Sequence, residues 1–147
     1  MLSLASTVSG GAGYEDSCLA YSASLPEVFG PPLWWVIHTT AATYPKAPDP
    51  QRQEECVSFV QALPGMVPCS ACGAHLRSEL AQHDIAAACA SSKALSHMWC
   101  RVHNAVNARL GKPLMDCNLV QEEYETVPIC NPLDAFAAGT PHVVVPS

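Results

Sequence analysis

The sequence contains few charged residues and few cations. Asp, Glu, Lys and Arg make up 14% of the 147 residues, Lys and Arg together number seven, and the formal net charge is -6. Because the seven cations are scattered, the chain lacks the basic patch that marks a nucleic-acid-binding protein. No apolar run approaches the ~18 residues that a membrane span needs. The sequence therefore predicts neither a nucleic acid nor a membrane as a partner.

Targeting and strand signals are also missing. Residues 1–17 have no positive start and no long apolar stretch, so they resemble neither a secretory signal nor an Arg-rich transit peptide. The only strand-like run, residues 143–145, is too isolated to form a sheet. Helical spacing of apolar residues dominates instead. We expect helices from Pro31, from Pro50 to Pro64-Gly65, from Cys69 to about Gln82, from Ser91 or Ser92 to Gly111, and from Cys117 to about Tyr124.

These signals predict an all-α fold, a four-helix bundle plus a short fifth helix. A chain of this length forms one domain. We expect a flexible N-terminal segment at residues 1–28, a helical core at 29–125 and a C-terminal tail at 126–147.

Cysteine, in contrast, is abundant. Eight cysteines are many for a domain of this size, and an even number permits complete pairing. A secreted disulfide scaffold is the simplest interpretation. However, no signal segment is evident, and 49% hydrophobic residues suffice for a core without such cross-links. We therefore expect some of the cysteines to take part in chemistry.

The pair Cys69-Ser70-Ala71-Cys72, which follows Pro68, is the most informative of these. Thiols at this spacing can form a disulfide, bind a metal or remain free. At the start of a helix, unpaired N–H groups and the helix dipole favour the thiolate, which is the form that attacks disulfides. The position of the pair thus favours a redox role over zinc binding.

Cys100 and Cys117 lie on either side of a chain reversal at Gly111 to Pro113, so their sulfurs can meet. We expect a structural disulfide here, which would stabilise the fold by roughly 3 kcal/mol.

Two helix faces combine an aromatic ring with an imidazole. Trp34 and His38 are one turn apart with Tyr44 just beyond, and His103 shares a face with Asn107. Such faces suit a planar ligand with a polar edge. Taken alone, these residues are more often part of an ordinary core.

The motifs, taken in order, resemble those of the Erv/ALR family of FAD-linked sulfhydryl oxidases. They are Gly30-x-x-x-Trp34-x-x-x-His38, Tyr44-Pro45, Pro68-Cys69-x-x-Cys72, Cys100-x-x-His103-Asn104-x-Val106-Asn107, Leu110-Gly111-Lys112-Pro113 and Asp116-Cys117. The resemblance covers about residues 29–124, and the ordered set is far more specific than any one motif.

The resemblance implies a helical bundle, usually a homodimer, that holds FAD without a covalent bond. It implies that protein dithiols are oxidised through Cys69-Cys72 and that electrons pass to FAD and then to O2, which gives H2O2. Cys72 would be the sulfur next to the flavin and Cys69 the sulfur that exchanges with substrate. Cys100 and Cys117 fall where the family has a structural disulfide. The positions that fall on FAD contacts are Trp34, His38, Tyr44, His103, Asn104, Val106, Asn107 and Lys112.

Three positions depart from the family pattern. Pro31 stands where many members have Arg, Met115 where Phe or Tyr is common, and Tyr124 where some members have Trp. The first two departures bear on individual FAD contacts rather than on the fold, and the third is milder.

The family pattern leaves four cysteines unassigned, and the sequence leaves their pairing open. Cys130, and after it Cys18, are the candidates for a shuttle that delivers electrons to Cys69. Cys56 lies on an apolar helix stripe, where a free buried thiol is common. Cys89 lies in a stretch of small residues.

Two alternatives belong to other functional classes. Cys69, Cys72, Cys100 and His103 could form a structural Cys3His zinc site, although Cys117 would then lack a partner. The chain could also be a disulfide-stabilised interaction module. For the leading interpretation, the compartments that fit are a virion or cytoplasmic viral assembly site and the mitochondrial intermembrane space.

Overall fold

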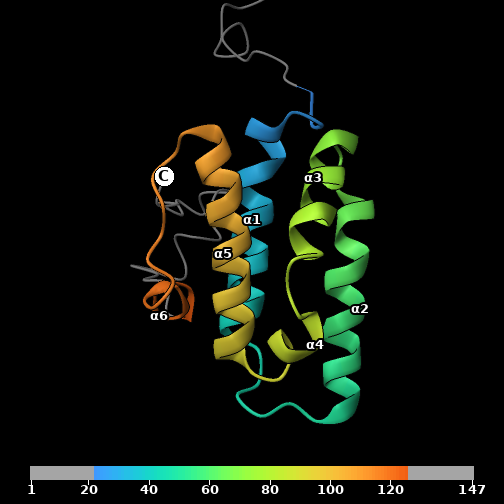
Figure 1. Ribbon diagram of the computed structural model, residues 1–147, viewed down its shortest axis with the longest axis vertical. Coiled ribbons are helices and arrows are strands. Elements are labelled where there is room, and N and C mark those ends of the chain that lie inside the picture. The colour runs from blue at the N-terminus through green and yellow to red at the C-terminus, as the bar shows by residue number, and fades with distance from the viewer. Residues whose placement is uncertain (1–21, 126–147) are drawn as a thin grey trace, which may run out of the picture.

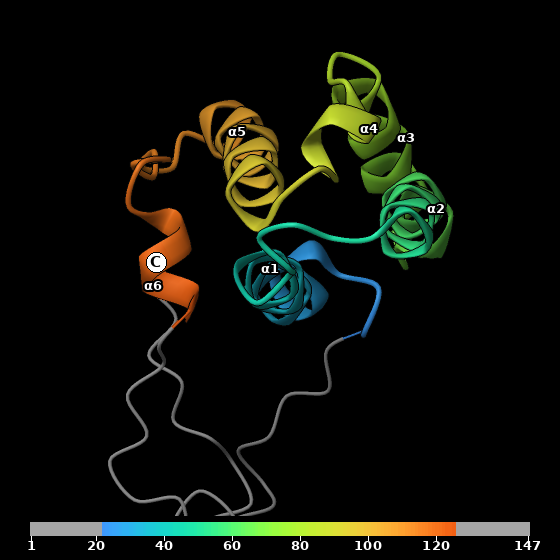
Figure 2. The same cartoon turned by 90° about the horizontal axis from the view of Figure 1, so that it is seen from below.

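The computed structural model describes residues 22–125, and these are helical with no strand. The helices are α1 (Pro26–Ala42), α2 (Pro50–Met66), α3 (Ser70–Leu80), α4 (Ile85–Ala88), α5 (Ser92–Leu110) and α6 (Val120–Glu125). The four longer helices run along the long axis of the molecule (Figure 1). Viewed from below, they surround a common centre, and α6 lies outside the bundle on the side of α1 and α5 (Figure 2). The predicted all-α fold is confirmed.

Capping residues set the helix ends that the sequence predicts. Asp49 caps α2, since its Oδ1 accepts a hydrogen bond from the Arg52 N–H at 2.7 Å. Ser91 caps α5 in the same way through the Ala94 N–H, at 3.2 Å. Gly111 ends α5 in the left-handed region, with φ of 67°, where a residue without a Cβ is favoured.

The first helix begins earlier than the sequence indicates. Pro26, rather than Pro31, occupies its first turn, where a missing N–H costs nothing. Pro31 and Pro32 lie inside α1 and deprive the carbonyl groups of Glu27 and Val28 of their helical donors. Both of these residues are exposed, so water can replace the lost bonds.

The other helix boundaries shift less. Pro64 lies inside α2, which extends to Met66, and the single turn α4 has no counterpart among the expected helices. The last helix begins at Val120 rather than at Cys117.

The core is centred on Trp99, whose side chain is 1% exposed and packs in one cluster with Ile37, Val60 and Val102. This cluster joins α1, α2 and α5. Helix α3 meets α2 at Gly73, where a Cβ would collide with the carbonyl oxygen of Pro64. The end of α2 therefore lies directly against the first turn of α3, and this contact fixes the position of Cys72.

Three disulfides cross-link the described residues. They join Cys56 to Cys89, Cys69 to Cys72, and Cys100 to Cys117. The last pair is the predicted structural bridge. The first pair ties α2 to the end of α4, so Cys56 is not the free buried thiol that its apolar stripe indicates. Cys18 and Cys130 lie outside the described residues.

Candidate functional site

The Cys69–Cys72 disulfide lies at the N-terminus of α3, as the sequence predicts. Cys69 is the N-cap residue, and its Sγ accepts a hydrogen bond from the Cys72 N–H at 3.2 Å. Both cysteines are partly exposed, in contrast to Cys89 and Cys100, which are fully buried. The start of α3 lies at the same end of the bundle as the start of α1 and the end of α5 (Figure 1). Because both cysteines are partly exposed, a thiol in solution can reach the pair.

A cluster of four rings from α1, α5 and α6 forms the second part of the site, and we call it the ring cluster: Trp34, His38, His103 and Tyr124. Trp34 stacks on His103 with centroids 4.0 Å apart and planes 6° apart. His38 stacks on Tyr124 at 4.7 Å. A hydrogen bond of 2.9 Å between His38 Nε2 and His103 Nδ1 joins the two stacks. Three segments distant in the sequence thus meet at these rings.

Both imidazoles of the ring cluster are neutral at pH 7. Burial, aided by the charge of His103, lowers the pKa of His38 to about 3. Burial, aided by Lys112, lowers the pKa of His103 to about 4. In the hydrogen bond between the rings one nitrogen donates and the other accepts, so the two rings adopt complementary tautomers.

The remaining ring nitrogen of His38 is unsatisfied. Its Nδ1 is buried and has no hydrogen-bond partner among residues 22–125. A buried polar atom in this state costs about 1–3 kcal/mol. A bound ligand with a complementary polar edge would remove this cost, and Nδ1 is the atom of this site that most clearly indicates one.

Three further residues predicted for the site lie around the ring cluster or close to it in sequence. Asn107 is 8% exposed, and Val106 is half-buried. Lys112 follows the end of α5, its N–H donates to the Asn107 carbonyl at 2.9 Å, and its exposed side chain is close enough to affect the pKa of His103. This combination of flat faces, an unsatisfied buried nitrogen and a nearby cation suits a planar ligand that carries a negative group.

Tyr44 and Asn104 are engaged with the protein framework. The Tyr44 hydroxyl lies 3.1 Å from the carbonyl oxygens of both Arg52 and Cys89. The Asn104 amide donates to the Met115 carbonyl at 2.9 Å and accepts from the Met115 N–H at 2.8 Å. In the structure these two side chains position the chain around the site, and their direct contact with a ligand stays a prediction.

Tyr124 was not among the predicted site residues, although the structure stacks it on His38. The signal available in the sequence was the family comparison, which places a Trp at this position in some members. Burial raises the pKa of the Tyr124 hydroxyl. An aromatic ring here therefore completes the ring cluster whether it is Trp or Tyr.

The structure does not assemble the alternative zinc site. Cys69 forms a disulfide with Cys72, Cys100 forms a disulfide with Cys117, and His103 is hydrogen-bonded to His38. Across residues 22–125 no group of three or more potential ligands is arranged to hold a metal ion. The same part of the chain contains no helix long and apolar enough to cross a bilayer.

Comparison with known proteins supports the same interpretation. The sequence model of the Erv1 / Alr family matches residues 31–125 of this chain. The mitochondrial FAD-linked sulfhydryl oxidase erv1 of Schizosaccharomyces pombe is 36% identical over 97 residues, which cover 65% of this chain and 53% of the yeast protein. Protein 347L of Invertebrate iridescent virus 6 is 30% identical over 104 residues, which cover 67% of this chain and 94% of the viral protein.

A solved structure shares the fold. The FAD binding domain of Erv1 from Saccharomyces cerevisiae superimposes with a TM-score of 0.63 at 29% identity, covering 67% of this chain and 92% of that one. The chain spans about half the length of the fission-yeast relative. The family match covers most of the described helices, and its range includes the Cys69–Cys72 and Cys100–Cys117 disulfides. The chain therefore belongs to the Erv1 / Alr family.

Proposed function

We propose that this protein is an FAD-dependent thiol oxidase that introduces disulfides into protein substrates. The overall reaction converts two substrate thiols and O2 into one substrate disulfide and H2O2. The observation that carries the proposal is the partly exposed Cys69–Cys72 disulfide at the start of a helix, in a chain of the Erv1 / Alr family.

The first half of the reaction is thiol–disulfide exchange. A substrate thiolate attacks Cys69 Sγ, forms a mixed disulfide and releases Cys72 as a thiolate. A second substrate thiolate then attacks the substrate sulfur of the mixed disulfide and releases Cys69 as a thiolate, which takes up a proton from solvent. Two electrons have then moved from the substrate to the cysteine pair. The N–H groups at the start of α3 stabilise the thiolate that forms there.

The residues that we propose to hold FAD fit such a group. Trp34 and His103 offer flat faces, His38 Nδ1 offers an unsatisfied buried nitrogen, and Lys112 offers a cation for a phosphate. Asn107, Val106, Tyr44 and Asn104 complete the proposed set. When bound, FAD would accept the electron pair from the dithiol and transfer it to O2. The relative whose structure is named as an FAD binding domain supports this assignment.

A visible spectrum and one variant test the proposal. We expect the purified protein to be yellow, with the bands of oxidised flavin. Cys72→Ala should abolish H2O2 production from a dithiol and leave the helical content unchanged. The matched control is the double variant Cys56→Ala/Cys89→Ala, which removes a different disulfide and should retain turnover below its melting temperature. A colourless protein, or full turnover in Cys72→Ala, would contradict the proposal.

Electron delivery within the chain is proposed to involve Cys130 or Cys18. All six cysteines of residues 22–125 are paired, which leaves these two of the eight for a shuttle. A shuttle residue should accelerate oxidation of protein substrates and should not affect oxidation of a small dithiol that reaches Cys69 directly. Cys130→Ala and Cys18→Ala, each assayed with both kinds of substrate, test this. If both variants oxidise both kinds of substrate at the rates of the unaltered protein, neither cysteine acts as a shuttle.

We also propose a homodimer. Leu25, Val28 and Val36 are 39%, 40% and 47% exposed, and with Pro32 they form an apolar stripe that begins at the N-cap of α1 and continues along the helix. A second copy packed on this stripe would bury it. Light scattering should give twice the monomer mass, and Val36→Asp should give the monomer. A mass of one chain for the unaltered protein would contradict this proposal.

The proposed compartments remain a viral assembly site or virion and the mitochondrial intermembrane space. The matches include a protein named as mitochondrial and a viral one. Fractionation of the cells that produce the protein distinguishes the two locations.

A further inference from the structure

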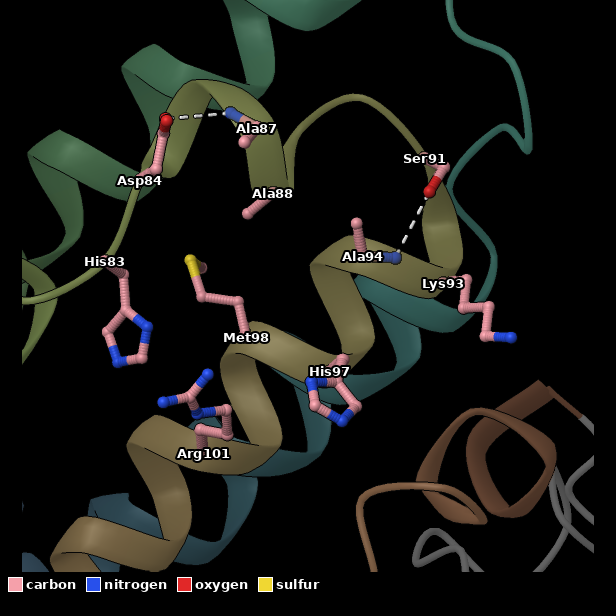
Figure 3. A pocket seen from close by; sticks show the side chains of 10 residues that line it. All are labelled: His83, Asp84, Ala87, Ala88, Ser91, Lys93, Ala94, His97, Met98 and Arg101. Atoms are coloured by element: carbon pink, nitrogen blue, oxygen red, sulfur yellow. Dashed lines mark hydrogen bonds between the residues drawn. The ribbon is translucent and has the colours of Figure 1, made fainter.

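A second concave site lies away from the cysteine pair and the ring cluster. It is a hollow of about 470 Å3 between α5, α4 and the loop that precedes α4 (Figure 3). We call it the α5 hollow. Lys93, His97 and Arg101 line it from α5, and His83 lines it from the loop before α4. Ala88 and Met98, which are 7% and 5% exposed, contribute buried apolar surface.

The α5 hollow concentrates the positive groups of an acidic protein. The chain has seven Lys and Arg residues and a formal net charge of -6, yet two of the seven cations face this hollow. Lys93, His97 and Arg101 follow one another at intervals of four residues, so they form a row on one side of α5. Figure 3 shows the side chains of His83 and Arg101 next to each other, both beside Met98.

These cations have no acidic partner in the described part of the chain, where the only ion pair joins Arg52 to Glu55. One carboxylate, that of Asp84, lines the hollow, and its Oδ1 already accepts a hydrogen bond from the Ala87 N–H at 3.0 Å. Glu79 of α3 also acts on His83, but burial and then Arg101 have the larger effects and lower the pKa of that imidazole. The balance of charge at the hollow is therefore positive.

The α5 hollow faces away from the ring cluster. Arg101 and His103 are two residues apart on α5, which separates their side chains by about 200° around the helix axis. The cysteine pair is also remote, because α3 and the following turn separate His83 from Cys72 by about 15 Å of helix rise. A ligand in the hollow would leave both parts of the proposed redox site accessible.

We propose that the α5 hollow binds a phosphate-bearing small molecule that also has an apolar portion. The guanidinium of Arg101 can bond two phosphate oxygens at once, and Lys93 adds a point charge. The N–H groups of His83 and His97 can donate to the remaining oxygens. The apolar portion would lie against Met98 and Ala88. This inference rests on the hollow alone and does not depend on the proposed oxidase activity.

Titration calorimetry on the full chain tests the inference. One equivalent of FAD is bound per chain beforehand and free FAD is removed, so that a phosphate-bearing probe cannot occupy the proposed cofactor site and FAD does not occupy the hollow. The probes are phenyl phosphate, which has both features, pyrophosphate, which has the charge alone, and phenol, which has the ring alone. We expect saturable binding of one phenyl phosphate per chain, weaker binding of pyrophosphate and no binding of phenol.

Two variants with the same change of charge locate the site. Arg101→Glu should weaken phenyl phosphate binding at least tenfold, because it replaces the bidentate donor by a repelling charge. Arg109→Glu, an exposed position on α5 that does not line the hollow, should change it less than twofold. Absence of saturable binding at millimolar probe would overturn the inference. Equal weakening in both variants would also overturn it, since that result indicates attraction to net charge alone. Far-ultraviolet spectra of both variants check that each one folds.

Discussion

The three disulfides should differ in their effect on stability in a defined order. A disulfide lowers the conformational entropy of the unfolded chain, so removing it lowers the free energy of unfolding. This loss grows with the logarithm of the length of the loop that the disulfide closes. The sequence separations are 33 for Cys56–Cys89, 17 for Cys100–Cys117 and 3 for Cys69–Cys72. The corresponding losses in the free energy of unfolding are about 4, 3 and 1.5 kcal/mol.

Burial adds to the first value. Cys89 is 0% exposed and Cys56 8% exposed, so replacing both by Ala leaves a small void that costs about 1 kcal/mol more. The partly exposed Cys69 and Cys72 have little such penalty. The bridge proposed to open and close in each turnover is therefore the one whose opening affects the fold least.

Urea unfolding of three double Cys→Ala variants, followed by circular dichroism, measures the order. The Cys56–Cys89 variant should lose about three times as much free energy of unfolding as the Cys69–Cys72 variant. Refutation would be a Cys56–Cys89 variant that is as stable as the unaltered protein, because a buried bridge across so long a loop cannot be neutral. A reversed order would refute the loop argument as well.

Three further expectations concern single groups. Gly73→Ala should lower the free energy of unfolding by about 1–3 kcal/mol because the new Cβ collides with Pro64, whereas Gly65→Ala, whose Cβ meets no atom of another segment within 4 Å, should raise it by about 0.5–1 kcal/mol; urea midpoints compare the two. Tyr44→Phe should cost about 1 kcal/mol through the lost hydroxyl bond, and no change in the thermal midpoint would show that the bond adds nothing. Stability should fall as the pH decreases from 6.5 toward 4, because His38 and His103, with pKa values of about 3 and about 4, take up protons in the unfolded chain before they do so in the folded one. The slope approaches about 1.4 kcal/mol per pH unit for each imidazole, and a His103→Gln variant with the same slope as the unaltered protein would contradict the assignment.

Much of the fold could be predicted because local chemistry determines it. Asp49, Ser91 and Gly111 cap helices through their own side chains or backbone conformation, so their effect is visible in the sequence. The predicted start of α1 at Pro31 was wrong. Pro31-Pro32 and Pro26 both suit the first turn of a helix, and the local sequence does not distinguish between them. Helix α4 has four residues, too few to show a helical period.

The site shows the same division between local and distant information. The positions of Cys69 and Cys72 follow from the helix start. The pairing of Cys56 with Cys89, in contrast, depends on the docking of α2 against α4, which no pattern within either segment reports. The stacking of Tyr124 on His38 likewise requires the fold, since the two residues belong to the first and the last helix in the sequence.

The hydrogen bonds between Asn104 and Met115 have a consequence for how the chain can vary. Both bonds go to the peptide N–H and carbonyl of residue 115, and neither involves its side chain. These two hydrogen bonds can therefore form with any residue except proline at position 115, while the Met115 side chain packs separately against the core around Cys100 and Tyr124. The substitution of methionine for the usual aromatic residue is accordingly tolerated by the framework. Relatives that keep these two hydrogen bonds can therefore differ at position 115, and the residue that identifies them is Asn104.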